Sequence, residues 1–153
     1  MAINVAINGF GRIGRLVLRG IIESGRKDLN VVAINDLGTI EANAHMLQYD
    51  SIHGSLKANV KATKTGISIN GKIIKVISER DPAALPWAKM NVDVAMECTG
   101  LFTSHETASK HIEAGAKRVL VSAPASGADL TVVYGVNHKK LRKSHKVVSN
   151  ASC

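Results

Sequence analysis

The stretch Asn8-Gly9-Phe10-Gly11-Arg12-Ile13-Gly14-Arg15 decides the fold, because its three glycines have G-x-G-x-x-G spacing. The apolar residues 3–7 before it are typical of a buried strand, and apolar residues at helical spacing follow it as far as Gly25. A second apolar strand is expected at residues 31–34 and leads into Asp36. The pattern predicts a strand–helix–strand unit with parallel strands and a right-handed crossover.

Each glycine of this loop has a physical task in binding a pyrophosphate. Gly9 permits the tight turn after the strand, and Gly11 lets the backbone approach the anion without an intervening Cβ. Gly14 allows close helix–strand packing, while the helix N-terminus presents unpaired N–H groups. Asp36 follows 22 residues after Gly14, where its carboxylate would bind the adenosine ribose and repel a 2′-phosphate. The loop and Asp36 therefore predict a dinucleotide site that selects NAD over NADP.

The rest of the chain alternates strands and helices around one irregular section. Thr39 can cap a short helix, residues 50–78 are broken by turns, and Asn70-Gly71 is a strong hairpin signal. Another helix is expected over residues 104–115. Four further strands are expected, at 92–98, 118–122, 131–134 and 146–149. We predict one domain over residues 1–153, a doubly wound, Rossmann-type α/β fold whose mostly parallel sheet carries a small antiparallel insertion.

Length and composition exclude several classes of protein. Hydrophobic residues make up 45% of the 153 residues and charged residues 21%, which excludes a disordered chain, a collagen-like repeat and a disulfide scaffold. No apolar run approaches the roughly 18 residues of a membrane-spanning helix, and the first residues lack the pattern of a secretory signal. Two cysteines suit a reducing compartment, so a cytoplasmic location is expected.

The charge balance favours an anionic small ligand. Twenty Lys and Arg residues against twelve Asp and Glu residues give a net charge of +8. Nucleic acid is the alternative partner, but aromatic residues are only 3%, which leaves few rings to stack on bases. The one basic cluster, residues 138–146, is expected to be a solvated helix face.

Thiols and imidazoles do not by themselves define an active site. Cys98 falls within an expected strand and is interpreted as a small packed core side chain. Cys153 follows a strand in the polar stretch 149–153, where open α/β sheets place ligand chemistry, but an incidental thiol is the simpler interpretation without a motif. The histidines lack metal-ligand spacing and are expected at the surface or at caps: His45, His53, His105, His111, His138 and His145.

Seven segments resemble phosphorylating glyceraldehyde-3-phosphate dehydrogenase. They are residues 8–15, 35–37, 49–51, 78–82, 97–102, 121–124 and 148–153. The segments are collinear and span the chain, and the ending Ser149-Asn-Ala-Ser-Cys153 is highly specific. Members of this family are about twice as long, so the resemblance implies the N-terminal NAD-binding domain, ending at the catalytic cysteine and without the C-terminal catalytic domain.

The resemblance also implies roles for individual residues. The implied cofactor contacts are Asn8, Gly9, Gly11, Arg12, Ile13 and Gly14 around the pyrophosphate, Asp36 and Arg80 around the adenosine, and Thr99, Gly100 and Ser122 toward the nicotinamide ribose. Ser152 would help to hold phosphate beside Cys153, which aligns with the catalytic nucleophile. No metal is implied.

The implied reaction belongs to the longer enzyme. A Cys153 thiolate would attack glyceraldehyde 3-phosphate, hydride would pass to NAD, and phosphate would cleave the thioester to give 1,3-bisphosphoglycerate. The parent is expected to be a homotetramer, and the 153-residue chain is expected to bind NAD without turnover. One alternative is the same domain of erythrose-4-phosphate dehydrogenase, which Asp36 disfavours modestly. The other is a non-catalytic basic module that binds a dinucleotide or RNA.

Overall fold

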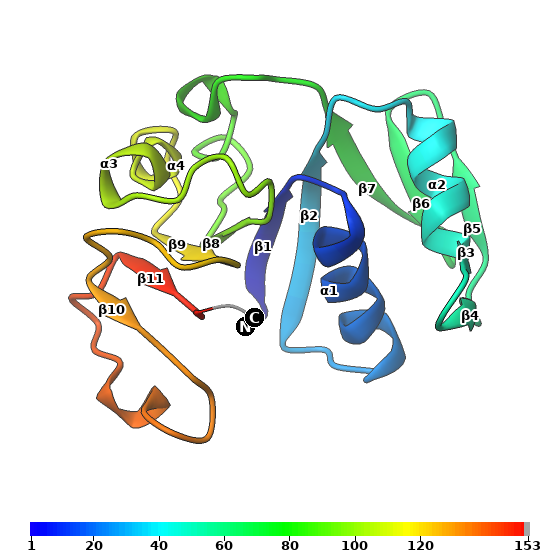
Figure 1. The fold of residues 1–153 in the computed structure, drawn as a ribbon. Helices are drawn as coiled ribbons and strands as arrows, with labels where there is room; N and C mark the ends of the chain where they lie inside the picture. The colour runs from blue at the N-terminus through cyan, green and yellow to red at the C-terminus, as the bar shows by residue number, and fades with distance from the viewer. Residues whose placement is uncertain (152–153) are drawn as a thin grey trace.

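The glycine loop joins the first strand to the first helix, as predicted. The computed structural model describes residues 1–151, and in it β1 (Ile3–Asn8) leads through the loop into α1 (Arg12–Glu23). Gly25 follows the helix with a φ of +64°, the left-handed conformation that favours glycine at a helix end. The next strand, β2 (Leu29–Asn35), lies beside β1 and parallel to it, which completes the strand–helix–strand unit (Figure 1).

Within residues 1–151, one nine-stranded sheet organises the fold. Its other strands are β5 (Val60–Ala62), β6 (Gly66–Ile69), β7 (Lys72–Ile77), β8 (Val94–Glu97), β9 (Arg118–Val121), β10 (Leu130–Thr131) and β11 (Val147–Ser149). The strand order is β10-β11-β9-β8-β1-β2-β7-β6-β5, and every pair from β10 to β7 is parallel. The doubly wound, mostly parallel fold is confirmed.

The antiparallel insertion forms one edge of this sheet. β5 and β6 run antiparallel to their neighbours, and the β6–β7 turn is Asn70-Gly71, with φ values of +50° and +87°. Both positive φ values fit the tight hairpin that the Asn-Gly pair predicts. A separate two-stranded hairpin, β3 (Tyr49–Asp50) with β4 (Gly54–Ser55), precedes it.

One expected helix forms as predicted, and another is broken in two. α2 (Ile40–Gln48) begins after Thr39, whose hydroxyl accepts a hydrogen bond from the backbone N–H of Ala42. The helix expected over residues 104–115 is instead two short helices, α3 (His105–Ala108) and α4 (Lys110–Glu113). The break falls at Ser109, whose hydroxyl donates to the carbonyl of His105, and such back-bonding disturbs a helix.

The basic cluster 138–146 is exposed but is not the expected helix face. Within it only a 3-10 turn forms, His138–Lys140, and a second 3-10 turn lies at Pro82–Ala84. The ring of His138 accepts from the backbone N–H of Gly135, and that of His145 accepts from the N–H of Arg142. These local bonds satisfy backbone groups without a helix.

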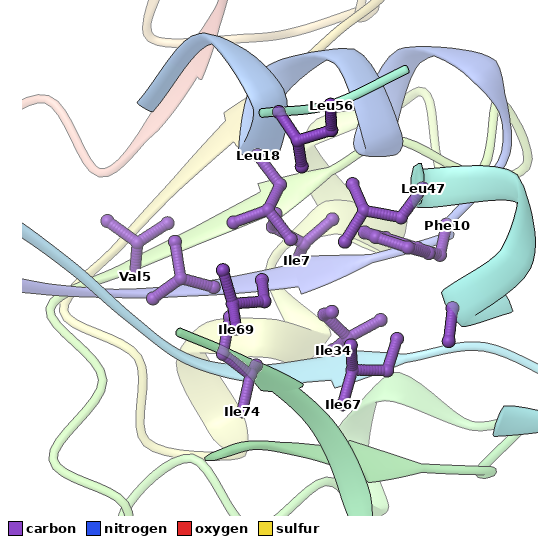
Figure 2. Close-up of a cluster of buried hydrophobic side chains, with 12 residues drawn as sticks. Val5, Ile7, Phe10, Leu18, Ile34, Leu47, Leu56, Ile67, Ile69 and Ile74 are labelled. Atoms are coloured by element: carbon purple, nitrogen blue, oxygen red, sulfur yellow. The ribbon is translucent and has the colours of Figure 1, made fainter. Parts of the chain in front are cut away.

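Apolar side chains fill both faces of the sheet. Along β1, Val5 and Ile7 belong to one core cluster and Ala6 to the other, because alternate side chains of a strand point to opposite faces. Figure 2 shows the first cluster, in which Leu18 of α1 and Leu47 of α2 pack toward the sheet. The second cluster lies around α3 and α4. The domain therefore has helices on both faces of one sheet.

The helices of residues 1–151 are short. The longest, α1, has twelve residues, and none in this part of the chain is both long and apolar enough to cross a membrane.

Candidate functional site

Three polar residues meet where the strand order reverses. From β1 the chain continues to β2 on one side and later to β8 on the other, and Asn8 at the end of β1 stands in register with Asn35 of β2 and Glu97 of β8. Open α/β sheets bind ligands outside the carboxyl ends of their strands at such a point. The topology therefore places the candidate site beside these three residues.

A cavity of about 380 Å³ opens at this position. Six residues expected at the cofactor site line it: Asn8, Gly9, Gly11, Asp36, Arg80 and Thr99. Seven lining residues were not expected there: Asn35, Leu37, Gly38, Glu79, Cys98, Leu101 and Phe102. The structure thus brings together residues more than 90 positions apart in the sequence around one cavity.

The three glycines have the surroundings that their predicted tasks require. Gly9 has a φ of +88°, and a Cβ there would lie 2.8 Å from the backbone nitrogen of Thr99. A Cβ on Gly14 would lie 2.1 Å from the carbonyl oxygen of Gly9, so helix and loop approach too closely for any side chain. A Cβ on Gly11 would meet no atom within 4 Å, because this residue faces open space.

The N-terminus of α1 is available to an anion. Gly11 is the residue that caps the helix, and no side chain of the described residues accepts a hydrogen bond at this cap. The N–H groups of a helix's first turn have no partner within the helix, and the helix dipole favours negative charge there. A phosphate group of a ligand in the adjacent cavity would meet these donors.

Asp36 is held rigidly beside the glycine loop. Its Oδ1 accepts from the backbone N–H of Phe10 at 2.9 Å, while its Oδ2 accepts from the N–H of Gly38 at 2.9 Å and from Asn43 Nδ2 at 3.0 Å. Burial by itself raises the pKa of Asp36, but these hydrogen bonds and the nearby Arg15 cation outweigh it and lower the pKa. The carboxylate is therefore charged and fixed in direction at neutral pH.

Five residues expected at the cofactor site do not line the cavity. Ile13 is half exposed, and Arg12 forms an ion pair with Asp50, N–O distance 3.0 Å. Gly100 lies between two lining residues, and the backbone N–H of Ser122 donates to the carbonyl of Glu97. The fifth, Gly14, packs against the loop as described above. Ser152 and Cys153 lie outside the described residues.

The expectation for Cys98 was incomplete. It lies one residue beyond β8, so the strand is shorter than residues 92–98, and its half-buried side chain both contacts the core and lines the cavity. Burial raises the pKa of the Cys98 thiol to about 11, so it is a neutral thiol at physiological pH.

The expectation for His111 was wrong, since this side chain is fully buried. Its Nε2 lies 2.6 Å from Glu97 Oε2, and the indole N–H of Trp87 donates to its Nδ1 at 2.9 Å. Asn8 Nδ2 also donates to Glu97 Oε2 at 2.7 Å, and both the backbone N–H and the hydroxyl of Thr99 donate to Oε1. A polar network, Trp87–His111–Glu97–Asn8–Thr99, therefore runs from the buried indole to the cavity, which Asn8 and Thr99 line.

The sequence contains little signal for this network or for Asn43. Asparagine is mostly exposed in proteins, and histidine is intermediate in burial. The partners Glu97 and Trp87 of His111 lie 14 and 24 positions away in the sequence, and Asn43 reaches Asp36 only through the conformation of the turn between them. Only the topology, which places the ends of β1 and β8 side by side, brings Asn8 and Glu97 into contact.

Comparison with known proteins agrees with this geometry. Residues 3–105 match the family model described as "Glyceraldehyde 3-phosphate dehydrogenase, NAD binding domain". The chain is 62% identical over 153 residues to glyceraldehyde-3-phosphate dehydrogenase of Xanthobacter flavus, covering all of this chain and 46% of that protein. It is 61% identical to the protein of the same name from Cereibacter sphaeroides, covering 45% of it, and 53% identical over 154 residues to that of Pseudomonas aeruginosa, covering 46%.

The chain thus spans a little under half the length of the curated relatives it matches. The family match covers the glycine loop, Asp36 and the β8 end, which are the parts that form the cavity. Fold, cavity and family match agree on NAD as the cofactor. The chain belongs to the glyceraldehyde 3-phosphate dehydrogenase NAD-binding domain family.

Proposed function

We propose that NAD binds in the cavity with its pyrophosphate at the N-terminus of α1 and its adenosine ribose at Asp36. Three observations support this position: the open space at Gly11, the free helix terminus and the charged Asp36 carboxylate. The proposed contacts are Asn8, Gly9, Gly11, Arg12, Ile13, Gly14, Asp36, Arg80, Thr99, Gly100 and Ser122.

The observation that carries the proposal is the fixed Asp36 carboxylate. Two backbone N–H groups and Asn43 set its direction at the rim of the cavity. A carboxylate so held can accept hydrogen bonds from ribose hydroxyls on its remaining lone pairs, and it repels a 2′-phosphate. Selectivity for NAD over NADP follows from this charge.

We propose that the longer parent carries out phosphorylating oxidation of glyceraldehyde 3-phosphate. The names of the relatives, glyceraldehyde-3-phosphate dehydrogenase, support the substrate and the oxidation. Bound NAD would supply the hydride acceptor. Residues 1–153 would supply the cofactor site and, through Cys153 with Ser152 beside it, the nucleophile and part of the phosphate site. A base, a clamp for the substrate phosphate and the contacts of a homotetramer would come from the C-terminal catalytic domain. A cytoplasmic location fits this role.

The test compares the 153-residue chain with a longer parent that includes the C-terminal domain. We expect calorimetry to show NAD binding by both proteins, and we expect NADH formation with aldehyde and phosphate only from the parent, because catalysis also needs a positioned base and a substrate clamp. Cys153→Ser in the parent should abolish NADH formation and preserve NAD binding. Undiminished turnover in that variant would contradict the assignment of the nucleophile.

A further inference from the structure

The hydrogen bonds behind the cavity all point toward one acceptor. The indole N–H of Trp87 can only donate, so His111 Nδ1 accepts and the imidazole carries its proton on Nε2. That proton is donated to Glu97 Oε2. From this side the network therefore ends at the carboxylate.

The same direction holds from the opposite side. The backbone N–H of Glu79 donates to Asn35 Oδ1, which fixes the orientation of the Asn35 amide, and Asn35 Nδ2 then donates to Asn8 Oδ1 at 2.7 Å. This in turn fixes Asn8, whose Nδ2 donates to Glu97 at 2.7 Å. The two donors of Thr99 complete the set.

Glu97 thus receives four hydrogen bonds and is 1% exposed. Burial alone would raise the pKa of Glu97, but the hydrogen bonds from His111, Thr99 and Asn8 outweigh burial and lower it. A side chain at this position must accept all four hydrogen bonds and donate none. The N–H₂ group of a glutamine would instead face at least one neighbour that can only donate.

We propose that Glu97, braced by His111, is a positioning residue for cofactor binding that holds Asn8 and Thr99 in the arrangement the NAD pocket needs. The inference rests on the proposed NAD site, since Asn8 and Thr99 line the same cavity as Asp36. Glu97 and His111 do not line that cavity and act through their neighbours.

One consequence is that the pocket is linked to Trp87, the only tryptophan in the sequence. Trp87 is fully buried and does not line the cavity. Its single indole N–H resonance should shift when NAD binds, because a change at Asn8 or Thr99 passes through Glu97 and His111 to the indole.

The test uses calorimetric NAD titration together with the ¹⁵N–¹H indole signal of Trp87, measured on the 153-residue chain. Glu97→Gln should weaken NAD binding roughly tenfold, because relaxed Asn8 and Thr99 must be reordered on binding. The pair His111→Gln and His111→Met separates positioning from packing, since both side chains have the same length. Glutamine can accept from Trp87 and donate to Glu97, whereas methionine cannot donate.

His111→Gln should keep the affinity within about twofold and retain the indole shift, whereas His111→Met should weaken binding several-fold and lose it. Val92→Ala serves as the control, because Val92 is buried in the core cluster that contains Trp87 and does not line the cavity. It should lower thermal stability with NAD affinity unchanged.

Wild-type affinity in Glu97→Gln, or equal losses in the two His111 variants, would overturn the inference while leaving the NAD site intact. If Glu97→Gln does not fold, the two His111 variants decide. Failure of the unaltered chain to bind NAD would instead overturn the proposed function, and this inference with it.

Discussion

Gly11 and Gly14 are three residues apart, and their surroundings predict different effects of substitution on stability and on NAD binding. Gly14→Ala would place a Cβ 2.1 Å from a backbone oxygen, so we expect a loss of about 1–3 kcal/mol in the free energy of unfolding. Gly11→Ala meets no protein atom, so stability should change by less than about 1 kcal/mol. Its methyl group would instead occupy space beside the helix N-terminus and weaken NAD binding roughly tenfold.

Chemical denaturation and calorimetry on both variants check this prediction. The wild-type chain is the reference for each measurement. Equal stability losses in Gly11→Ala and Gly14→Ala, or full NAD affinity in Gly11→Ala, would contradict the assignment of different tasks to the two glycines.

We expect Asp50 to cause part of the pH dependence of the free energy of unfolding. The backbone N–H groups of His53 and Ile52 donate to its carboxylate, as does Arg12, and together they hold the pKa of Asp50 well below its usual range. A lowered folded-state pKa stabilises the protein above the unfolded-state pKa, and that stability is lost as the pH falls toward the folded-state value.

Asp50→Asn removes this titration and keeps the shape of the side chain. We expect the free energy of unfolding to fall less steeply in the variant than in the wild type between about pH 5 and pH 3. Urea denaturation at a series of pH values measures the two slopes. Parallel slopes would show that Asp50 does not contribute to acid unfolding.

At the residue scale, the sequence was informative where one residue type has one task. Gly9, Gly14 and Asp36 were predicted from spacing, and the structure places them at the turn, the helix contact and the cavity rim. The roles of His111 and Asn43 were not predicted. His111 acquires its role from Glu97, a partner on another element, and Asn43 acquires its role from a turn conformation that the sequence does not specify.

At the scale of elements, one buried cation joins α1, α2 and the β3–β4 hairpin. Arg19 of α1 is 2% exposed, and its guanidinium donates to the carbonyls of Leu47, Gln48 and Gly54. The first two carbonyls lie at the end of α2, where backbone acceptors lack partners within the helix.

Arg19→Met should therefore lower the free energy of unfolding by about 2–4 kcal/mol, because three carbonyl groups lose a charged donor. Arg26→Met is the matched control, since Arg26 has an exposed ion pair with Asp28 that is largely screened by solvent, and it should change stability much less. Urea denaturation at neutral pH compares them. Similar losses in both variants would show that Arg19 does not join the elements as described.

Element types followed from the sequence more reliably than element lengths. The Thr39 cap and the Asn70-Gly71 hairpin formed as predicted, because each depends on residues adjacent in sequence. β10 is shorter than residues 131–134 because the Asn137 side chain takes the Thr131 carbonyl and the Val133 N–H as hydrogen-bond partners. Side-chain competition of this kind has no clear pattern in the sequence.

At the scale of the whole molecule, the alternation of strands and helices was sufficient to predict a doubly wound sheet. It did not predict the strand order or the register that puts Asn8 opposite both Asn35 and Glu97. These depend on the packing of the two core clusters on opposite faces of the sheet. The cofactor site is thus a product of topology as well as of the glycine motif.

The central claim is that the Asp36 carboxylate selects NAD, and the ratio of NAD to NADP affinity in Asp36→Ala tests it most directly. If the substitution merely loosened the loop, the binding of NAD and of NADP would weaken alike. Loss of the carboxylate charge instead relieves a repulsion that only the 2′-phosphate of NADP experiences. We expect calorimetry to show NAD binding weakened by about 1–3 kcal/mol and a much smaller preference over NADP than in the wild type. An unchanged ratio would contradict the claim and remove Asp36 from the cofactor site.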